Sequence, residues 1–453
     1  MEIEASTPVL GKDILAIIRT DMDKTVLPSW IEPAPRNWGT TEHGKLSADQ
    51  WRVLCTVHLP ISLISTWNDG SARHSAMLTN FMDLVTAVRI ASMRVTNHEY
   101  IALYDQHIFS YLSGILELYK DADIKPNHHL SLHLGHFLQT FGPVHSYRTF
   151  AFERINYMMQ RMKTNARPGN CFDCEHSKPH LTILRFLGQM EKMFLFTACR
   201  NASLQVLLKD EAIGGTVEGL LKSFRSFTDE NHRGSRLSDF RNPGQQLKLM
   251  GNPKPIHLDE CTHSALRSFV TSVATMPVPW VDFVTGSRQK VKAFKKIIIH
   301  GVSFQTRYSA ARDSYITFED GDKIWSGSID KILLPEGAVD IHSVLLSIET
   351  FSPLSPNDQQ KDPYRLWGFS GGELFYDIFL DTPLIITPAQ ILGHIAKTSV
   401  GRVFEIGRPC VHTLPLDQVQ VRTTSTLYFT RYSTTHQFMS DVQEAGGNDE
   451  VVE

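Results

Sequence analysis

The sequence predicts an α+β protein, in which a mostly helical N-terminal region is followed by a small β-barrel-like domain. Apolar residues recur at helical spacing through much of residues 45–235, whereas short β-prone runs alternate with turn signals from Lys296 onward. Between these regions glycine and proline cluster without apolar periodicity, which indicates a linker. The predicted parts are an extended N-terminal connector (1–44), a helical domain (45–235), a linker (236–290), a β-rich barrel-like domain (291–435) and a disordered acidic tail (436–453).

The helical elements are predicted from capping residues and apolar spacing. The prolines between Pro28 and Pro35 favour an extended chain before the first helix. Ser47-Ala48-Asp49-Gln50 is a capping-box pattern, so a helix is expected from there to about Leu59, where Pro60 bends or ends it. Thr96-Asn97-His98-Glu99 is a second such pattern. Further helices are predicted over residues 76–93, 101–119, 127–140, 152–162 and 187–208.

The β elements are predicted from runs of β-branched and aromatic residues. These runs cover residues 297–299, 303–308, 314–318, 324–329 and 343–348. Asp320-Gly321 between two of them is a hairpin signal, although its loop looks longer than the tight two-residue type. One helix is expected after Pro388.

Composition narrows the function classes. The 453 residues include 45 basic and 48 acidic ones, so no overall positive charge indicates nucleic-acid binding and any DNA contact must use local patches. The 6 cysteines and the absence of a signal-like N-terminus predict free thiols in a reducing compartment, not secretion. No uninterrupted apolar stretch is long enough for a membrane span.

Three histidines form the first candidate site. His129, His133 and His136 fall on one stripe of the helix predicted after Pro126, and two histidines one turn apart can bind a metal ion. Such spacing also occurs at a core boundary, where the imidazoles bond to their neighbours. Glu153 could complete a divalent-metal site or act as a general base, or it could form an ion pair with Arg154 or Arg161.

Cysteines and histidines form a second candidate metal site. Zinc-type ligands occur close together at Cys171, Cys174, His176 and His180. The gap between Cys174 and His176 is much shorter than the loop that separates ligand pairs in ordinary zinc fingers, so an exposed loop is the alternative.

Two basic clusters are candidates for DNA phosphate contacts. The first contains Arg154, Arg161, Lys163 and Arg167, and the second contains Lys292, Lys295 and Lys296. Because the overall charge is near neutral, solvated faces are the alternative for both.

Several separated motifs carry a family resemblance. Lys125-Pro126-Asn127-His128-His129 is followed by His133, by Phe141-Gly142-Pro143-Val144, and by Phe152-Glu153-Arg154 with Asn165. Matching stretches elsewhere are Leu27-Pro28-Ser29-Trp30, Gly44-Lys45-Leu46, Ala48-Asp49-Gln50-Trp51-Arg52, Leu59-Pro60-Ile61, Asp362-Pro363-Tyr364-Arg365, Gly371-Gly372-Glu373-Leu374-Phe375-Tyr376 and His394-Ile395-Ala396-Lys397-Thr398. Together they resemble the C-terminal part of CACTA-type (En/Spm-like) DNA transposases in the form abundant in mushroom-forming fungi. The resemblance extends from about Leu27 to Leu416.

The resemblance implies an RNase-H-like nuclease in which two aspartates and a glutamate hold divalent metal ions. The aspartates are expected upstream of Pro28, and only 27 residues precede that position, so both are expected to be missing. Glu153 would then be the surviving glutamate, with His129 and His133 beside it. We therefore expect no cofactor for the chain alone, and Mg²⁺ or Mn²⁺ only within an intact transposase.

The resemblance also bears on the zinc candidate and on the β region. Residues 166–184, which contain the Cys/His cluster, interrupt the family pattern, and our hypothesis is a lineage-specific insertion or a translated intron. The β region resembles a chromatin-reader barrel of the bromo-adjacent-homology type. A peptide groove or aromatic cage could be lined by Trp325, Tyr364, Trp367 and Phe375, although barrel core is the alternative for all four.

The sequence thus predicts a transposase-derived, catalytically incomplete protein that retains contacts with transposon ends, chromatin or an assembly. A homo-oligomer, a location in the nucleus ahead of the cytoplasm, no membrane partner and no small-molecule substrate go with this prediction. The alternative is a metal-dependent nuclease fragment that is active only when another segment completes its site.

Overall fold

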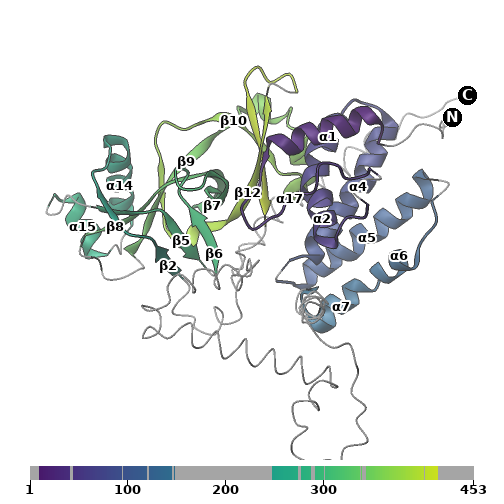
Figure 1. Ribbon diagram of the computed structural model, residues 1–453, viewed down its shortest axis with the longest axis horizontal. Coiled ribbons are helices and arrows are strands. Elements are labelled where there is room, and N and C mark those ends of the chain that lie inside the picture. Colours follow the sequence, from purple (N-terminus) through teal and green to yellow (C-terminus); the bar gives the residue numbers. More distant parts are fainter. Residues whose placement is uncertain are drawn as a thin grey trace, which may run out of the picture. The chain divides into compact units, whose positions relative to one another are not determined.

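The computed structural model describes residues 10–40, 44–93, 95–119, 122–144, 147, 247–273, 277–286, 291–299, 301–336, 338, 343–401 and 404–416. Residues 1–145 and 234–453 belong to one compact unit, and residues 146–233 belong to a second. The described residues confirm the α+β prediction, since a helical region at residues 12–141 is followed by an antiparallel six-stranded β-barrel (Figure 1).

The first helices begin and end where local chemistry requires it. The Ser47 hydroxyl and the Gln50 side chain form the predicted capping box at the start of α2 (Ala48–Val53). A π-helical turn (Leu54–His58) then leads into α3 (Leu59–Thr66), with Pro60 in its first turn. Proline has no amide hydrogen and clashes with a preceding helical carbonyl, which explains why the hydrogen-bond pattern changes just before it.

A pair of long helices forms the centre of the helical region. α4 (Ala72–Ala91) packs against α5 (His98–Leu118). Asn80 donates a hydrogen bond to the Tyr111 carbonyl, and Gly114 lets the Asn80 side chain approach closely. The short helices α6 (Pro126–Ser131) and α7 (Leu134–Phe141) follow, and the Tyr104 hydroxyl of α5 donates to the Ser131 carbonyl.

The barrel is closed by hydrogen bonds around a complete ring. Neighbouring strands pair in the order β7 (Tyr315–Asp320), β8 (Lys323–Pro335), β9 (Leu345–Pro353), β10 (Glu373–Phe379), β13 (Cys410–Leu416), β12 (Ile391–Gly401), and β12 pairs again with β7. Alternate side chains along these strands point inward. Ser326 of β8 and Thr413 of β13 lie 3.4 Å apart although their strands are not neighbours, so both face the interior.

Three layers cover the outside of the barrel. A three-stranded sheet of β2 (Leu247–Met250), β5 (Lys296–Ile299) and β6 (Val302–Gln305) buries Ile297 and Phe304 against it. The helices α14 (Glu260–Ser272) and α15 (Val278–Val284) cover the far parts of β8 and β9. The helical region covers β10, β12 and β13, with β1 (Thr25–Val26) paired to β12. The remaining strands are β3 (Lys254–Ile256), β4 (Val291–Phe294) and β11 (Leu384–Ile386).

Two predicted connecting segments contain regular structure. Residues 1–44 were expected to be extended, but α1 (Lys12–Lys24) is helical because Ile18 and Met22, one turn apart, are buried together. Residues 236–290 were expected to be a linker, but they contain β2, β3, α14 and α15. Leu266 and Val270 of α14 repeat at helical spacing and pack on the barrel, so this segment is part of the core.

Four smaller predictions are also wrong. Asn97 rather than Thr96 caps α5, because the Asn97 side chain accepts a hydrogen bond from the Tyr100 amide. The single helix predicted over residues 127–140 is divided into α6 and α7. The hairpin loop between β7 and β8 has two residues, Gly321 and Asp322, with Gly321 at φ 59°. After Pro388 only one 3₁₀ turn forms before β12.

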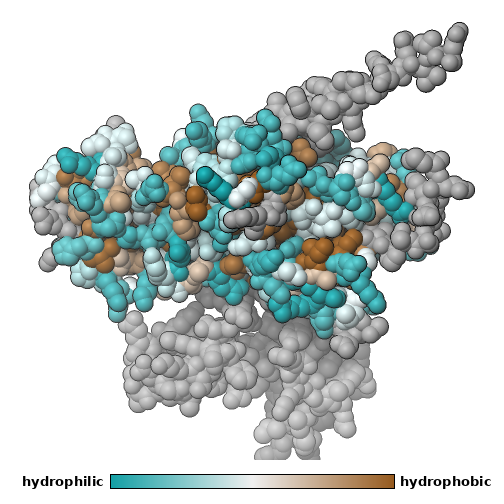
Figure 2. Space-filling view, turned by 90° about the horizontal axis from the view of Figure 1, so that it is seen from above, coloured by the Kyte–Doolittle hydropathy of each residue, from teal (hydrophilic) through white to brown (hydrophobic). Residues whose placement is uncertain are grey.

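The outer surface of the described residues is mixed in polarity. Hydrophilic side chains cover most of the face shown in Figure 2, and hydrophobic side chains occur there as separate patches. No helix in the described part of the chain is long and apolar enough to cross a bilayer.

Candidate functional site

The predicted histidine stripe is partly present. The Nε2 atoms of His129 and His133 lie 3.3 Å apart, with the two rings meeting edge to face at the break between α6 and α7. His136 contacts the Phe137 ring. Within the described ranges no cluster of three or more His, Cys, Asp or Glu residues could hold a metal ion. The His129 and His133 imidazoles are exposed and share a hydrogen bond.

Many of the predicted site residues cannot be placed beside these histidines. The candidates that lie outside the described residues are Glu153, Arg154, Arg161, Lys163, Arg167, Cys171, Cys174, His176 and His180. The catalytic, zinc and first DNA-contact hypotheses that depend on them therefore stay predictions.

The four aromatic residues predicted to form a peptide groove lie in different clusters. Tyr364 is fully buried and Trp367 packs against the same core, where the helical region meets the barrel. Phe375 is buried inside the barrel, and Trp325 packs beneath the three-stranded sheet. The rings thus belong to three separate clusters, and this placement favours the barrel-core alternative over a shared aromatic cage.

One polar network joins the N-terminal segment to the barrel. The Trp30 indole donates to Nδ1 of His394 at 3.3 Å, and Nε2 of His394 donates to the Asp313 carbonyl at 3.3 Å. The Asp313 carboxylate accepts the Ser29 amide at 2.7 Å. The His394 ring also stacks on Phe304, with centroids 4.3 Å apart. These bonds orient a neutral imidazole, and burial lowers the pKa of His394 to about 4.

A second network joins α3 to the barrel. The Tyr364 hydroxyl donates to the Ile61 carbonyl at 2.8 Å, and Nε2 of His412 donates to the Gly371 carbonyl at 2.6 Å. The Asp362 carboxylate accepts the amides of Tyr364 and Leu374, each at 2.9 Å. Burial raises the pKa of Asp362 to about 6 and lowers that of His412 to about 4. The side chains of Tyr364, His412 and Asp362 thus all form hydrogen bonds with backbone groups.

The barrel interior contains an aromatic cluster that the sequence did not reveal. Phe351 stacks on Phe379 at 4.8 Å and on Tyr315 at 6.3 Å. The Lys397 ammonium lies 5.5 Å from the Tyr315 ring and 3.6 Å from the Asp377 carboxylate. The only sequence signal was the alternating pattern of β12, which placed Lys397 on the same face as Ile395. The positive charge of Lys397 is thus paired with groups inside the barrel.

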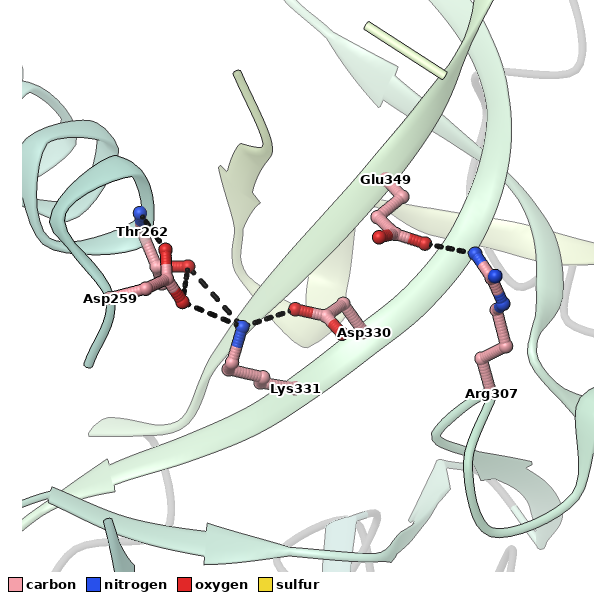
Figure 3. Close-up of polar contacts among 6 residues, drawn as sticks. All are labelled: Asp259, Thr262, Arg307, Asp330, Lys331 and Glu349. Atoms are coloured by element: carbon pink, nitrogen blue, oxygen red, sulfur yellow. Dashed lines mark hydrogen bonds and ion pairs between the residues drawn. The ribbon is translucent and has the colours of Figure 1, made fainter. Parts of the chain in front are cut away.

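Other charged residues near the barrel are paired (Figure 3). Lys331 donates to Asp259 at 3.1 Å and to Asp330 at 2.5 Å, while Arg307 pairs with Glu349 at 2.5 Å. Asp259 also caps α14 through Thr262. Partial burial alone would raise the pKa of Asp259, but the bonds from Thr262 and Lys331 outweigh it and lower this pKa to about 2. These cations are already neutralised locally.

A different group of cations is unpaired. The segment that contains β2 and β3 (residues 247–256) runs antiparallel to the segment that contains β4 and β5 (residues 291–299), and we call this pair of segments the lysine ribbon. Neither segment contains an acidic residue. In the part of the chain that the structure describes, no ion pair involves its lysines, Lys248, Lys254, Lys292, Lys295 and Lys296.

The lysine ribbon extends the second predicted basic cluster. Sequence reasoning singled out Lys292, Lys295 and Lys296, but it assigned Lys248 and Lys254 to a linker. Their membership depends on the pairing of β2 with β5 and of β3 with β4, which joins residues roughly 35 to 50 positions apart. Comparisons with protein-family models, with curated proteins and with solved structures found no match to this chain.

Proposed function

We propose that this chain is a transposase-derived protein that contacts DNA or chromatin in the nucleus and does not cut DNA by itself. One observation carries the proposal: five of the motifs that together resemble CACTA-type transposases, although far apart in the sequence, contact one another where the N-terminal region meets the barrel.

The convergence is specific to named contacts. The Leu27 to Trp30 motif meets the His394 to Thr398 motif through the bond between Trp30 and His394. The Leu59 to Ile61 motif meets the Asp362 to Arg365 motif through the bond between Tyr364 and Ile61. The Gly371 to Tyr376 motif meets the Asp362 motif through the bond from the Leu374 amide. These five motifs are therefore parts of the same structural framework.

The proposal that the chain does not cleave DNA by itself is supported by the roles of its buried polar residues. Asp362, His394 and His412 are residue types that often serve in catalysis, but each is buried and bonded to backbone or to a neighbouring ring. Among the described residues, the lysine ribbon instead gathers unpaired positive charge on two adjacent segments. That charge suits contact with a polyanion such as DNA.

The test compares binding with cleavage in the full-length chain. Supercoiled plasmid and a short duplex are incubated with the purified protein, with and without Mg²⁺ or Mn²⁺. We expect salt-sensitive duplex binding and no nicking, and a Glu153→Ala variant that behaves like the wild type. Metal-dependent nicking that Glu153→Ala abolishes would contradict the proposal. So would the absence of any binding to DNA or to histone peptides.

The alternative function is a nuclease fragment completed by another segment. The observation in its favour is the 3.3 Å approach of His129 and His133, which places two potential ligands together. Zn²⁺ or Mn²⁺ titration followed by calorimetry tests this pair. A stoichiometric site lost in His129→Ala would favour the alternative, whereas no heat of binding would leave the histidines as a hydrogen-bonded pair.

A further inference from the structure

The lysine ribbon consists of two consecutive paired stretches, one in each of two sheets. Along one segment, β4 is followed by Lys295 and then by β5. On the other segment, β3 is paired with β4 and β2 is paired with β5. The chain therefore passes from one sheet into the other, and the pairing is interrupted at residues 251–253. At about 3.3 Å per residue, residues 291–299 extend at most about 26 Å.

The lysines follow this length instead of gathering at one point. Lys248 is paired in register with Ile298, and Lys296 with Met250, so the two lysines are diagonal neighbours on the same face of the three-stranded sheet. That face is open to solvent, since Met250 between them is 46% exposed. Lys295 is exposed at the junction of the strands.

The other two lysines extend the charge along the ribbon. Lys254 is exposed beside Ala293, and Lys292 is half-buried beside Pro255. Positive charges are thus present along the length of the paired segments, with Lys254 and Lys292, at adjacent register positions, pointing to opposite faces. Lys331 and Arg307, in contrast, are each paired with a carboxylate (Figure 3).

An extended ligand with regularly spaced negative charges fits this arrangement best. Duplex DNA presents one phosphate about every 3.4 Å along each strand, so several phosphates fall within the length of the ribbon. Lysine contacts phosphate as a point charge, while base reading commonly uses arginine or a side-chain amide. Among the described residues of the two paired segments the only such group is Asn252, in the turn between β2 and β3.

We propose that the lysine ribbon binds the phosphate backbone of double-stranded DNA without reading its sequence. This inference rests on the proposed function, which it deepens by naming the contact surface and the kind of contact. Binding releases the cations that surround DNA, so affinity falls as salt rises, and each lysine that contacts a phosphate contributes to that dependence.

The experiment measures duplex binding by fluorescence anisotropy, using the full-length chain and duplexes of unrelated sequence. The test variant combines Lys248→Ala, Lys295→Ala and Lys296→Ala. Its matched control combines Lys12→Ala, Lys45→Ala and Lys323→Ala, which remove the same charge from exposed positions elsewhere. Urea unfolding of all three proteins establishes that each is folded.

We expect the ribbon variant to bind about tenfold or more weakly, and its salt slope to be shallower by about three, while the control changes Kd by about twofold at most. All duplex sequences should give similar affinities. Equal binding by the ribbon variant and the wild type would overturn the ribbon assignment and leave the proposed function standing. Equal losses in both variants would also overturn it.

Two further outcomes identify other ligands. If the wild type binds no duplex even at low salt, the proposed function and this inference both fail. If phosphatidylserine vesicles or a poly-glutamate peptide bind more tightly than duplex at the same salt, and this binding is lost in the ribbon variant, the surface serves a different polyanion. That result would overturn the DNA assignment.

Discussion

At the scale of single residues, the fold depends on a close approach at Gly371 and Gly372. Gly372 has φ 77°, and a Cβ atom there would lie 2.3 Å from the Thr413 carbonyl oxygen and 2.8 Å from Nε2 of His412. Only glycine can adopt this backbone conformation at such a distance. The sequence showed two glycines that indicated a turn, but it could not show that a buried histidine lies against them.

This contact gives the first prediction. Gly372→Ala should lower the free energy of unfolding by at least about 3 kcal/mol, because backbone strain and a clash with backbone combine. Gly321→Ala is the matched control: Gly321 has φ 59° but no atom within 4 Å of its Cβ position, so its cost should be about 1 kcal/mol. Urea unfolding measures both, and equal losses would show that the clash is relieved.

The buried histidines give a prediction about pH. Burial lowers the pKa of His58, His394 and His412 to about 4, whereas in the unfolded chain each titrates near 6.5. Between these values the unfolded state binds more protons, so stability should fall as pH falls from about 6.5 to 4. Asp362, whose pKa is raised to about 6, acts in the opposite direction but is a single group.

The measurement is the urea midpoint at several pH values. The wild type should lose stability below about pH 6.5, by up to about 1.4 kcal/mol per pH unit for each histidine. His394→Gln should show a dependence that is shallower by about one proton, because glutamine does not titrate. A wild-type midpoint that stays constant from pH 7 to pH 5 would contradict the neutral state of these imidazoles.

At the scale of elements, the sequence predicted best where the signal is local. The Ser47 capping box and the barrel strands β7, β8 and β9 were found because capping and alternation depend on nearby residues, whereas β10, β12 and β13 were not predicted. β2 and β3 were missed because they are short, have Gly251 and Pro253 between them, and are strands only through partners roughly 35 to 50 residues away. The candidate site was incomplete for the same reason.

The segment from Leu27 to Trp30 gives a prediction at this scale. Asp313 accepts the Ser29 amide at 2.7 Å and the Gln305 side chain at 3.0 Å, and only 2% of it is exposed. Asp313→Ala should cost about 2 to 4 kcal/mol, since two donors lose their partner. Asp381→Ala, at an exposed position, should have almost no effect. Hydrogen exchange of the Ser29 amide should rise in Asp313→Ala, and an unchanged rate would contradict the assigned role.

At the scale of the molecule, the helical region and the barrel form one core. The largest buried cluster contains Met82 and Ile64 from the helices together with Tyr364 and Leu374 from the β region. Sequence reasoning separated these regions into domains because their periodicities differ. Periodicity identifies the type of element, but it does not show which outer face of a barrel will be buried by other elements.

This shared core gives the last stability prediction. A fragment of residues 247–416 should not fold cooperatively, because it would expose the outer faces of β10, β12 and β13 that the helices cover. Size-exclusion chromatography should show aggregation, and its amide spectrum should lack dispersion. A monomeric fragment with a sharp unfolding transition would show that the barrel is an independent domain.

The central proposal is that the lysine ribbon is the surface through which this protein contacts DNA. Formaldehyde crosslinking of the full-length chain to duplex DNA, followed by peptide mapping, tests this most directly. We predict that the crosslinked lysines lie in residues 247–256 and 291–299, and that high salt removes the crosslinks. Crosslinks found only outside these two segments, or no more crosslinks than in a sample without DNA, would contradict the account.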